Sequence, residues 1–310
     1  MRFLDVKTDY AFKKVFGDDE SKEILISFLN SICEFKIVDL KVVDPYNIPM
    51  LKGMKDTYVD VKAKLDDGKT VIIEMQVLNH EGFEKRVLYN AAKNYSTQLS
   101  KNEAYHLLNP VIALTITDFK MFETDKYITY FRLMEKYEFI EYSGDIELIF
   151  IELPKFKKEL KECETIQDKW IYFIKNAGKL DYIPKSLDNE IKKALERANE
   201  ANLTEEELEL QYKRKEFILI QKGSIEKAKK EGIKEGIEEG IKKGIEEGIK
   251  KGIKEGVKKG IEDGIKKGIE EGEKSAKISI AINLMDVLDD ETISQRVGLP
   301  IEEIRKLRDC

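Results

Sequence analysis

Alternating polar and apolar residues flank a short turn in the stretch TYVDVKAKLDDGKTVIIEMQV, residues 57–77. Side chains in a strand point to opposite faces with period two, so shifting the pairing by one residue reverses every side chain. The apolar residues of both arms share a face only if Leu65 pairs with Lys69. This register leaves a three-residue loop ending in Gly68, where a left-handed conformation is favoured. The pattern therefore predicts a hairpin with strands over residues 57–65 and 70–77.

Three polar side chains share the opposite face of this predicted hairpin. Asp60 lies across from Glu74, Gln76 follows on the same side, and Val59 faces Met75. Opposed like charges destabilise a strand pair unless a proton, a cation or splaying relieves them. Mg²⁺ takes one or two carboxylates and completes its shell with water and substrate phosphate. The pattern thus leaves two interpretations, a metal site for phosphodiester hydrolysis or an exposed strand face with ordinary acids.

The residues around this hairpin resemble the PD-(D/E)XK nuclease superfamily, in which an Asp precedes (E/D)-x-K on a hairpin. More narrowly, the chain is similar to the recombination-promoting nuclease/putative transposase family, known as Rpn. Four stretches carry the resemblance in the family's order: TDYAFKKVFGDDESKEILISFLNSI from residue 8, YVDVKAKLDDGKTVIIEMQ from residue 58, KRVLYNAAKNYSTQL from residue 85 and NPVIALTITDF from residue 109.

The resemblance implies a metal-dependent DNA endonuclease linked to recombination, mobile elements or phage defence. It implies Asp60 and Glu74 as ligands of Mg²⁺ or Mn²⁺, and as catalytic residues together with Gln76. Gln76 stands where the superfamily has Lys and carries no charge, which leaves open what orients the water or offsets charge in the transition state. The supporting candidates, each of which could instead be an ordinary surface or core residue, are Asp9, Lys13, Lys62, Arg86 and Tyr89.

Periodicity on both sides of the hairpin predicts the rest of an α/β fold. The run PVIALTIT from residue 110 is typical of a buried central strand. We expect a restriction-endonuclease-like αβββαβ core with a mixed sheet, followed by an all-helical C-terminal extension. The expected elements are helices over residues 8–33, broken near Gly17, and 82–101, a strand over 37–43, and a second hairpin over 127–142 and 145–153 that turns at Ser143-Gly144.

We expect four segments along the chain. A nuclease core covers residues 1–155, and a helical region that packs on it covers 156–222. A Gly-Ile/Glu-Lys repeat of four residues follows over 223–275, and a small helix-turn-helix-like tail covers 276–310.

Within the repeat, Gly recurs every four residues from Gly232 to Gly272 and is followed by Ile or Val until Glu273. Gly disfavours a helix by about 1 kcal/mol relative to Ala, whereas each Glu-Lys pair four residues apart returns only about 0.2–0.5 kcal/mol. The stripe also advances by about 40° per repeat, in the sense of right-handed supercoiling. A self-associating helical stalk, and hence a homo-oligomer, and a flexible linker both remain open.

The tail sequence ETISQRVGLPIEEIRKLR predicts two short amphipathic helices meeting at Gly298, similar to a helix-turn-helix. In a DNA-reading unit the second helix would enter the major groove. That helix carries Glu302 and Glu303 beside its cations, so a helical cap or an oligomerisation module is the other interpretation. The candidates for nucleic-acid contact are Arg296, Arg305, Lys306 and Arg308.

Composition limits the compartment and the partners. Three separated cysteines, Cys33, Cys163 and Cys310, favour a reducing cytoplasm over a disulfide framework. No segment approaches the roughly 20 apolar residues of a membrane span, so we expect no membrane partner. The net charge of −6 argues against a DNA coat but leaves a nuclease acting on DNA possible. The alternative function is a catalytically inactive nuclease-like protein that acts as an oligomeric DNA- or protein-binding module.

Overall fold

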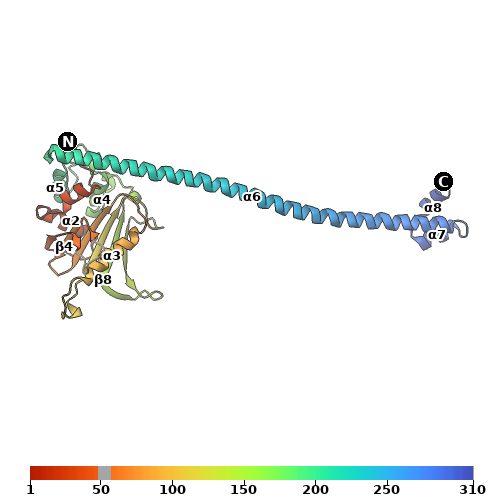
Figure 1. The fold of residues 1–310 in the computed structure, drawn as a ribbon, viewed down its shortest axis with the longest axis horizontal. Coiled ribbons are helices and arrows are strands. Elements are labelled where there is room, and N and C mark those ends of the chain that lie inside the picture. Colours follow the sequence, from red (N-terminus) through yellow and green to blue (C-terminus); the bar gives the residue numbers. More distant parts are fainter. Residues whose placement is uncertain (48–56, 310) are drawn as a thin grey trace. The chain divides into compact units, whose positions relative to one another are not determined.

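A computed structural model describes residues 1–47 and 57–309 of the chain. Its internal contacts divide it into two units, Met1–Glu226 and Lys227–Cys310, each of which we describe by itself. The first unit contains a sheet with helices on both faces (Figure 1). Long helix α6, Glu205–Leu284, begins in the first unit and continues through most of the second.

The sheet of the first unit has six strands in the order β1-β4-β5-β6-β8-β7. The pairs β5·β6 and β6·β8 are parallel and the others antiparallel, so the sheet is mixed, as predicted. Every residue of β6 is buried, which agrees with its unbroken apolar sequence. The strands are β1 Leu40–Val43, β4 Val61–Leu65, β5 Thr70–Gln76, β6 Val111–Thr117, β7 Ile128–Met134 and β8 Glu141–Glu152, with a separate pair β2 Tyr46–Asn47 and β3 Thr57–Tyr58.

Helices cover the two faces of this sheet unequally. One face packs in a large core with Trp170, Phe16 and Phe28, and the other forms a smaller core with Phe83 and Val87 of α3. Apart from the separate β2·β3 pair, and with the first helix divided into α1 and α2, the order of elements from α1 to β6 is the predicted αβββαβ core. The large core uses α1 Asp9–Phe16, α2 Lys22–Ile32, α4 Ile166–Asn176 and α5 Asn189–Arg197. The smaller core on the other face uses α3 Phe83–Ser96 (Figure 1).

The first hairpin has the predicted register. Val61 pairs with Ile73, and the Leu65 amide donates to the Lys69 carbonyl at 2.8 Å. Gly68 closes the three-residue loop with φ +90°, in the region that favours glycine.

Before Val61 the predicted strand is interrupted. The chain bends at Asp60, and a carboxylate oxygen of Asp60 accepts the Met75 amide at 2.7 Å. Val59 consequently packs in the smaller core, whereas Val61 packs in the larger one. The prediction that Val59 faces Met75 is therefore wrong, because a side-chain bond replaces the strand pairing there.

The turn between β7 and β8 also differs from its prediction. The turn lies at residues 135–140, and Ser143 is within β8, paired with Leu133. The carboxylate of Glu135 accepts the amides of Tyr137 and Glu138, both in the turn. Local hydrogen bonds to Glu135 thus stabilise a turn at residues 135–140, and the predicted turn at Ser143-Gly144 is wrong.

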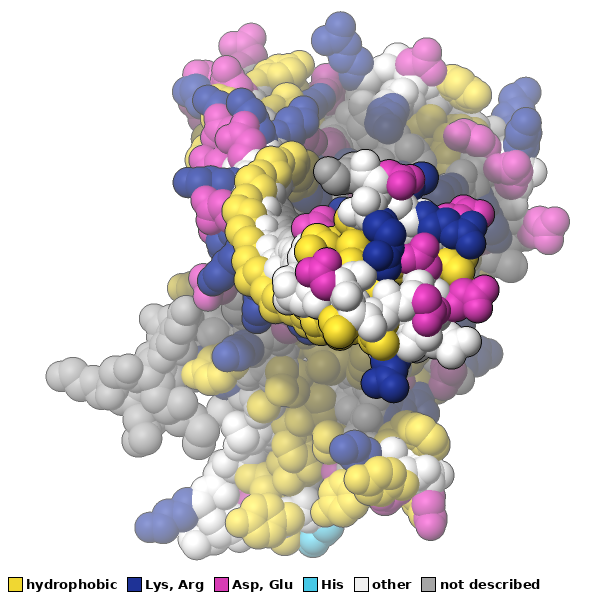
Figure 2. All heavy atoms as spheres, turned by 90° about the vertical axis from the view of Figure 1, so that its right-hand side faces the viewer, with side chains coloured by type: hydrophobic (Ala, Val, Ile, Leu, Met, Phe, Trp, Pro, Cys, Tyr) yellow, Lys and Arg dark blue, Asp and Glu magenta, His cyan; other side chains and the backbone are white. Residues whose placement is uncertain are grey.

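The first turns of α6 pack on the rest of the first unit. Arg214 lies 2.6 Å from the Asp9 carboxylate, and the Thr8 hydroxyl donates to Gln211 at 3.2 Å. The part of α6 in the second unit includes the four-residue repeat, and all ten Ile and Val side chains that follow its glycines are exposed. Figure 2 shows hydrophobic side chains in a curved band along this helix. Among the described residues, no helix is long and apolar enough to cross a membrane.

The tail is a small core of its own. Helices α7, Asp290–Val297, and α8, Ile301–Arg308, meet at Gly298, whose φ is +70°. Ala281, Ile293 and Ile304 are buried between these helices and the end of α6, Ala281 lying in α6 itself.

Two cysteines, Cys33 and Cys163, are buried free thiols, and Cys310 lies outside the described residues. Within residues 1–47 and 57–309, six short 3-10 helices join the larger elements, at Asp19–Ser21, Tyr105–Leu107, Leu153–Lys155, Leu160–Glu162, Ala177–Lys179 and Glu200–Asn202.

Gly68→Ala tests the predicted hairpin loop. A Cβ at Gly68 would lie 2.5 Å from the Asn109 side-chain oxygen, in addition to the strain of φ +90°. We expect Gly68→Ala to lower the free energy of unfolding by roughly 2 kcal/mol. Urea unfolding followed by the fluorescence of Trp170, the single tryptophan and fully buried, reports on this unit.

Gly82→Ala is the matched control. Gly82 has a similar φ of +78°, but a Cβ at this position would meet no atom within 4 Å. The loss of stability in this variant should be limited to backbone strain, about 1 kcal/mol. Equal losses in the two variants would show that the contact with Asn109 contributes nothing.

Candidate active site

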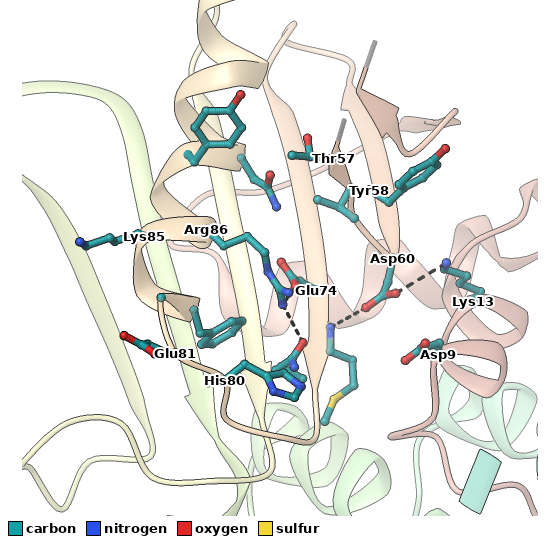
Figure 3. Close-up of a pocket in the computed structure, with 17 residues that line it drawn as sticks. Asp9, Lys13, Thr57, Tyr58, Asp60, Glu74, His80, Glu81, Lys85 and Arg86 are labelled. Atoms are coloured by element: carbon teal, nitrogen blue, oxygen red, sulfur yellow. Dashed lines mark hydrogen bonds and ion pairs between the residues drawn. The ribbon is translucent and has the colours of Figure 1, made fainter. Parts of the chain in front are cut away.

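A cavity of about 780 Å³ opens beside the first hairpin. Its walls come from α1, from the segment around β3, from the end of β5 and from the start of α3 (Figure 3). Three of the expected site residues, Asp60, Glu74 and Gln76, line it together. The predicted polar face of the hairpin is therefore the floor of a cavity and not an open strand surface.

Asp60 is positioned by the bend that precedes β4. One carboxylate oxygen accepts the Met75 amide, and the other lies 3.7 Å from the Lys13 ammonium of α1. The Asp60 side chain is only 13% exposed. Burial raises the pKa of Asp60 to about 6, a shift that the Asp9 carboxylate increases and the Met75 amide and Lys13 reduce.

Glu74 lies on β5, with its side chain 14% exposed. Burial raises its pKa, and the Arg86 guanidinium opposes this shift through an ion pair with a Glu74 oxygen. Arg86 also donates to the Gln76 side-chain oxygen at 2.8 Å, and its guanidinium lies 5.1 Å from the Phe83 ring centroid. The Gln76 amide nitrogen donates to the Leu78 carbonyl at 2.7 Å. The Gln76 oxygen thus holds Arg86, while its amide nitrogen fixes the side chain to the Leu78 carbonyl.

Most of the expected supporting residues reach this cavity. Asp9, Lys13, Arg86 and Tyr89 line it, the first two from α1 and the others from α3. The described lining residues do not include Lys62, although it lies on β4. The four cations proposed for nucleic-acid contact, Arg296, Arg305, Lys306 and Arg308, belong to the second unit.

Arg308 has local partners in that unit. It donates to the Asp290 carboxylate at 2.8 Å and to the carbonyls of Met285 and Leu288 at 2.9 and 3.1 Å. These bonds tie α8 to α7 and to the turn between α6 and α7. A role of Arg296, Arg305 and Lys306 in contacting DNA stays a prediction.

The sequence analysis missed seven polar or aromatic residues that line the cavity: Thr57, Tyr58, His80, Glu81, Phe83, Lys85 and Asn90. Asn90 is 1% exposed, and neither of its side-chain polar atoms has a hydrogen bond of ordinary geometry in the described part of the chain, although its amide helps to lower the pKa of Glu74. Asn90 follows Arg86 by four residues, so helical spacing could have identified it. Only folding brings His80 and Lys85 to the site.

The donor set suits a hard divalent cation. In the described residues, no group of three or more His, Cys, Asp or Glu side chains is arranged to hold a metal ion. Mg²⁺ and Mn²⁺ need fewer protein ligands, since one or two carboxylates with water and phosphate are sufficient. Asp60 and Glu74, whose pKa values are both raised by burial, offer such a pair at one cavity. The residues present therefore fit Mg²⁺ or Mn²⁺ better than zinc.

The raised pKa of Asp60 predicts a pH dependence of stability. The folded state holds this proton more tightly than the unfolded chain, so stability falls as pH rises from about 4 to about 6, where the folded group titrates. In wild type this titration should lower the free energy of unfolding by about 3 kcal/mol. Asp60→Asn cannot titrate, so we expect it to avoid this loss and to be more stable than wild type at neutral pH. The free energy of unfolding of both proteins can be measured across this pH range by urea unfolding in the presence of a chelator, with Trp170 fluorescence as the signal. Parallel pH profiles of the two proteins would contradict the prediction.

Comparison with known proteins agrees with this geometry. Neither the curated proteins nor the solved structures contain a match to the chain. The family model described as PD-(D/E)XK nuclease family transposase matches residues 6–228. This match covers most of the chain, including the sheet, the cavity and the first turns of α6, and confirms the resemblance seen in the sequence. The chain belongs to the PD-(D/E)XK nuclease family transposases.

Proposed function

We propose that this protein is a Mg²⁺- or Mn²⁺-dependent DNA endonuclease that hydrolyses phosphodiester bonds. The observation that carries the proposal is the convergence of two buried carboxylates, Asp60 and Glu74, on one open cavity. A cavity with raised carboxylate pKa values favours a bound cation, because the cation removes the cost of keeping both groups charged. The family provides the reaction class, nuclease chemistry on DNA.

Asp60 and Glu74 would hold the metal. When bound, the ion would lower the pKa of a water molecule and offset charge on the phosphate under attack. In this proposal Asp60 keeps its orientation during the reaction, because the Met75 amide and Lys13 each bind one of its oxygens.

Arg86 is our candidate for the charge that Lys supplies elsewhere in the superfamily. Its ion pair with Glu74 competes with a cation at the same carboxylate, so metal binding would free the guanidinium for a phosphate oxygen. Its Nε is buried and has no hydrogen-bond partner among the described residues, which leaves a donor for that oxygen. Gln76 would then act as a positioning residue that holds Arg86, since both its polar ends are already bonded.

Cleavage of supercoiled plasmid by the full chain tests the carboxylate roles. With Mg²⁺ or Mn²⁺ we expect nicking by wild type and a loss of about a hundredfold or more in Asp60→Asn and in Glu74→Gln. Asp66→Asn is the matched control, because Asp66 is an exposed acid of the same hairpin. Chelator should abolish wild-type cleavage.

Thermal unfolding gives a second, independent readout. Mg²⁺ should raise the melting temperature of wild type and of Asp66→Asn but not of the two site variants, because only a folded site binds it. Metal-independent cleavage, or equal cleavage by all four proteins, would refute the assignment. No cleavage by a folded wild type that still binds Mg²⁺ would favour the inactive, binding-only alternative.

We further infer that the second unit self-associates through its repeat. Ten Ile and Val side chains between Ile233 and Ile269 are each more than half exposed on a helix that carries almost no buried residue. A regular row of exposed aliphatic side chains is the usual mark of an interaction surface. Glycine before each of them would let a partner helix approach closely.

Ile241→Ser with Ile245→Ser should lower the oligomeric state of the full chain. Lys242→Ser with Glu246→Ser is the control, since it places the same residue on the same helix away from the Ile row. Light scattering after size exclusion measures the mass of each. A monomeric wild type, or the same mass in all three proteins, would overturn the inference.

A further inference from the structure

An exposed aromatic ring lies at the edge of the candidate active site. Tyr58 is 65% exposed and lines the cavity, two residues before Asp60 (Figure 3). The Tyr46 ring stacks on it, with ring centroids 4.6 Å apart and planes inclined by 29°. Tyr46 and Tyr58 also face each other across the short β2·β3 pair. The ring is thus fixed from one side while most of its surface remains in solvent.

A cross-strand aromatic pair by itself would explain this contact as stabilisation of a short ribbon. That explanation requires only that the Tyr46 and Tyr58 rings contact each other. It does not explain why a large aromatic ring remains mostly exposed at the cavity that holds Asp60 and Glu74. A rigid ring with one face held and much of its surface open is suited to stack a planar ligand.

The surroundings of Tyr58 indicate which planar ligand. Tyr89, from α3, lines the same cavity and is 38% exposed, and the cations Lys13 and Lys85 line it as well. Aromatic faces next to cations are the combination by which proteins bind unpaired nucleic acid, with bases on the rings and phosphates near the charges. A base within an intact duplex has both faces covered by its neighbours and cannot stack on a side chain.

Position along the strand connects this ring to the proposed reaction. Two residues of chain span at most roughly 7 Å, and Tyr58 and Asp60 line the same cavity, so a base on Tyr58 would belong to a nucleotide next to a phosphate at Asp60. We propose that the cleft takes DNA with an unpaired base beside the scissile phosphate, and that Tyr58 stacks on this base. The inference rests on the proposed endonuclease function and names its substrate class.

Binding and cleavage of two synthetic duplexes by the full chain test this proposal. They share one sequence, but one has a central unpaired bubble that contains 2-aminopurine, whose fluorescence falls on stacking. In chelator, Tyr58→Leu should bind the bubble about tenfold more weakly than wild type and lose the fluorescence decrease. Tyr58→Phe should behave as wild type, and Tyr137→Leu, at a ring 79% exposed but not among the cavity-lining residues, is the control.

With Mg²⁺, wild type should cleave the bubble duplex faster than the paired one, and Tyr58→Leu should lose this preference. Equal fluorescence changes in wild type and Tyr58→Leu, or a wild type that prefers paired DNA, would overturn the stacking proposal even if cleavage is metal-dependent. A Tyr58-dependent fluorescence change without any cleavage would support stacking and refute the endonuclease. An unchanged unfolding midpoint by Trp170 fluorescence shows that Tyr58→Leu is folded.

Discussion

The hydrogen bond from the Met75 amide to the Asp60 carboxylate is the interaction on which the site depends. It replaces a strand-to-strand bond at the point where the chain bends before β4. The bend turns Val59 toward the smaller core and leaves Asp60 facing the cavity beside Glu74. A regular strand would also have brought Asp60 opposite Glu74, but with no backbone donor to hold its carboxylate.

Burial and the neighbouring cations have opposite effects on the pKa values of Asp60 and Glu74. Desolvation raises the pKa of both, whereas Lys13 and Arg86 oppose the shift. In the proposed function a divalent ion would relieve the same desolvation cost, and at Glu74 it would take the place of Arg86. Gln76 fits this balance, since an uncharged residue can hold Arg86 without adding a second fixed positive charge beside Glu74.

Two predictions failed because they rested on the alternation of polar and apolar residues, which does not show side-chain hydrogen bonds to the backbone. Periodicity indicated a continuous strand through Asp60 and a turn at Ser143-Gly144, but the structure has a bend at the first and an unbroken strand at the second. In both cases an acidic side chain accepts backbone amides, from Met75 in one and from the turn after Glu135 in the other. Alternation records which residues are apolar and not which amides a carboxylate will bind.

The amino-acid pattern was enough to predict the hairpin register, the three-residue loop at Gly68 and the common face of Asp60 and Glu74, because a period of two leaves one register that buries the apolar set. It also determined the αβββαβ order and the family. The pattern could not predict that Arg86 and Lys13 pair with the acids or that Tyr58 lies at the edge of the cavity. Those contacts join segments far apart in the chain, and their geometry depends on how α1 and α3 pack on the sheet.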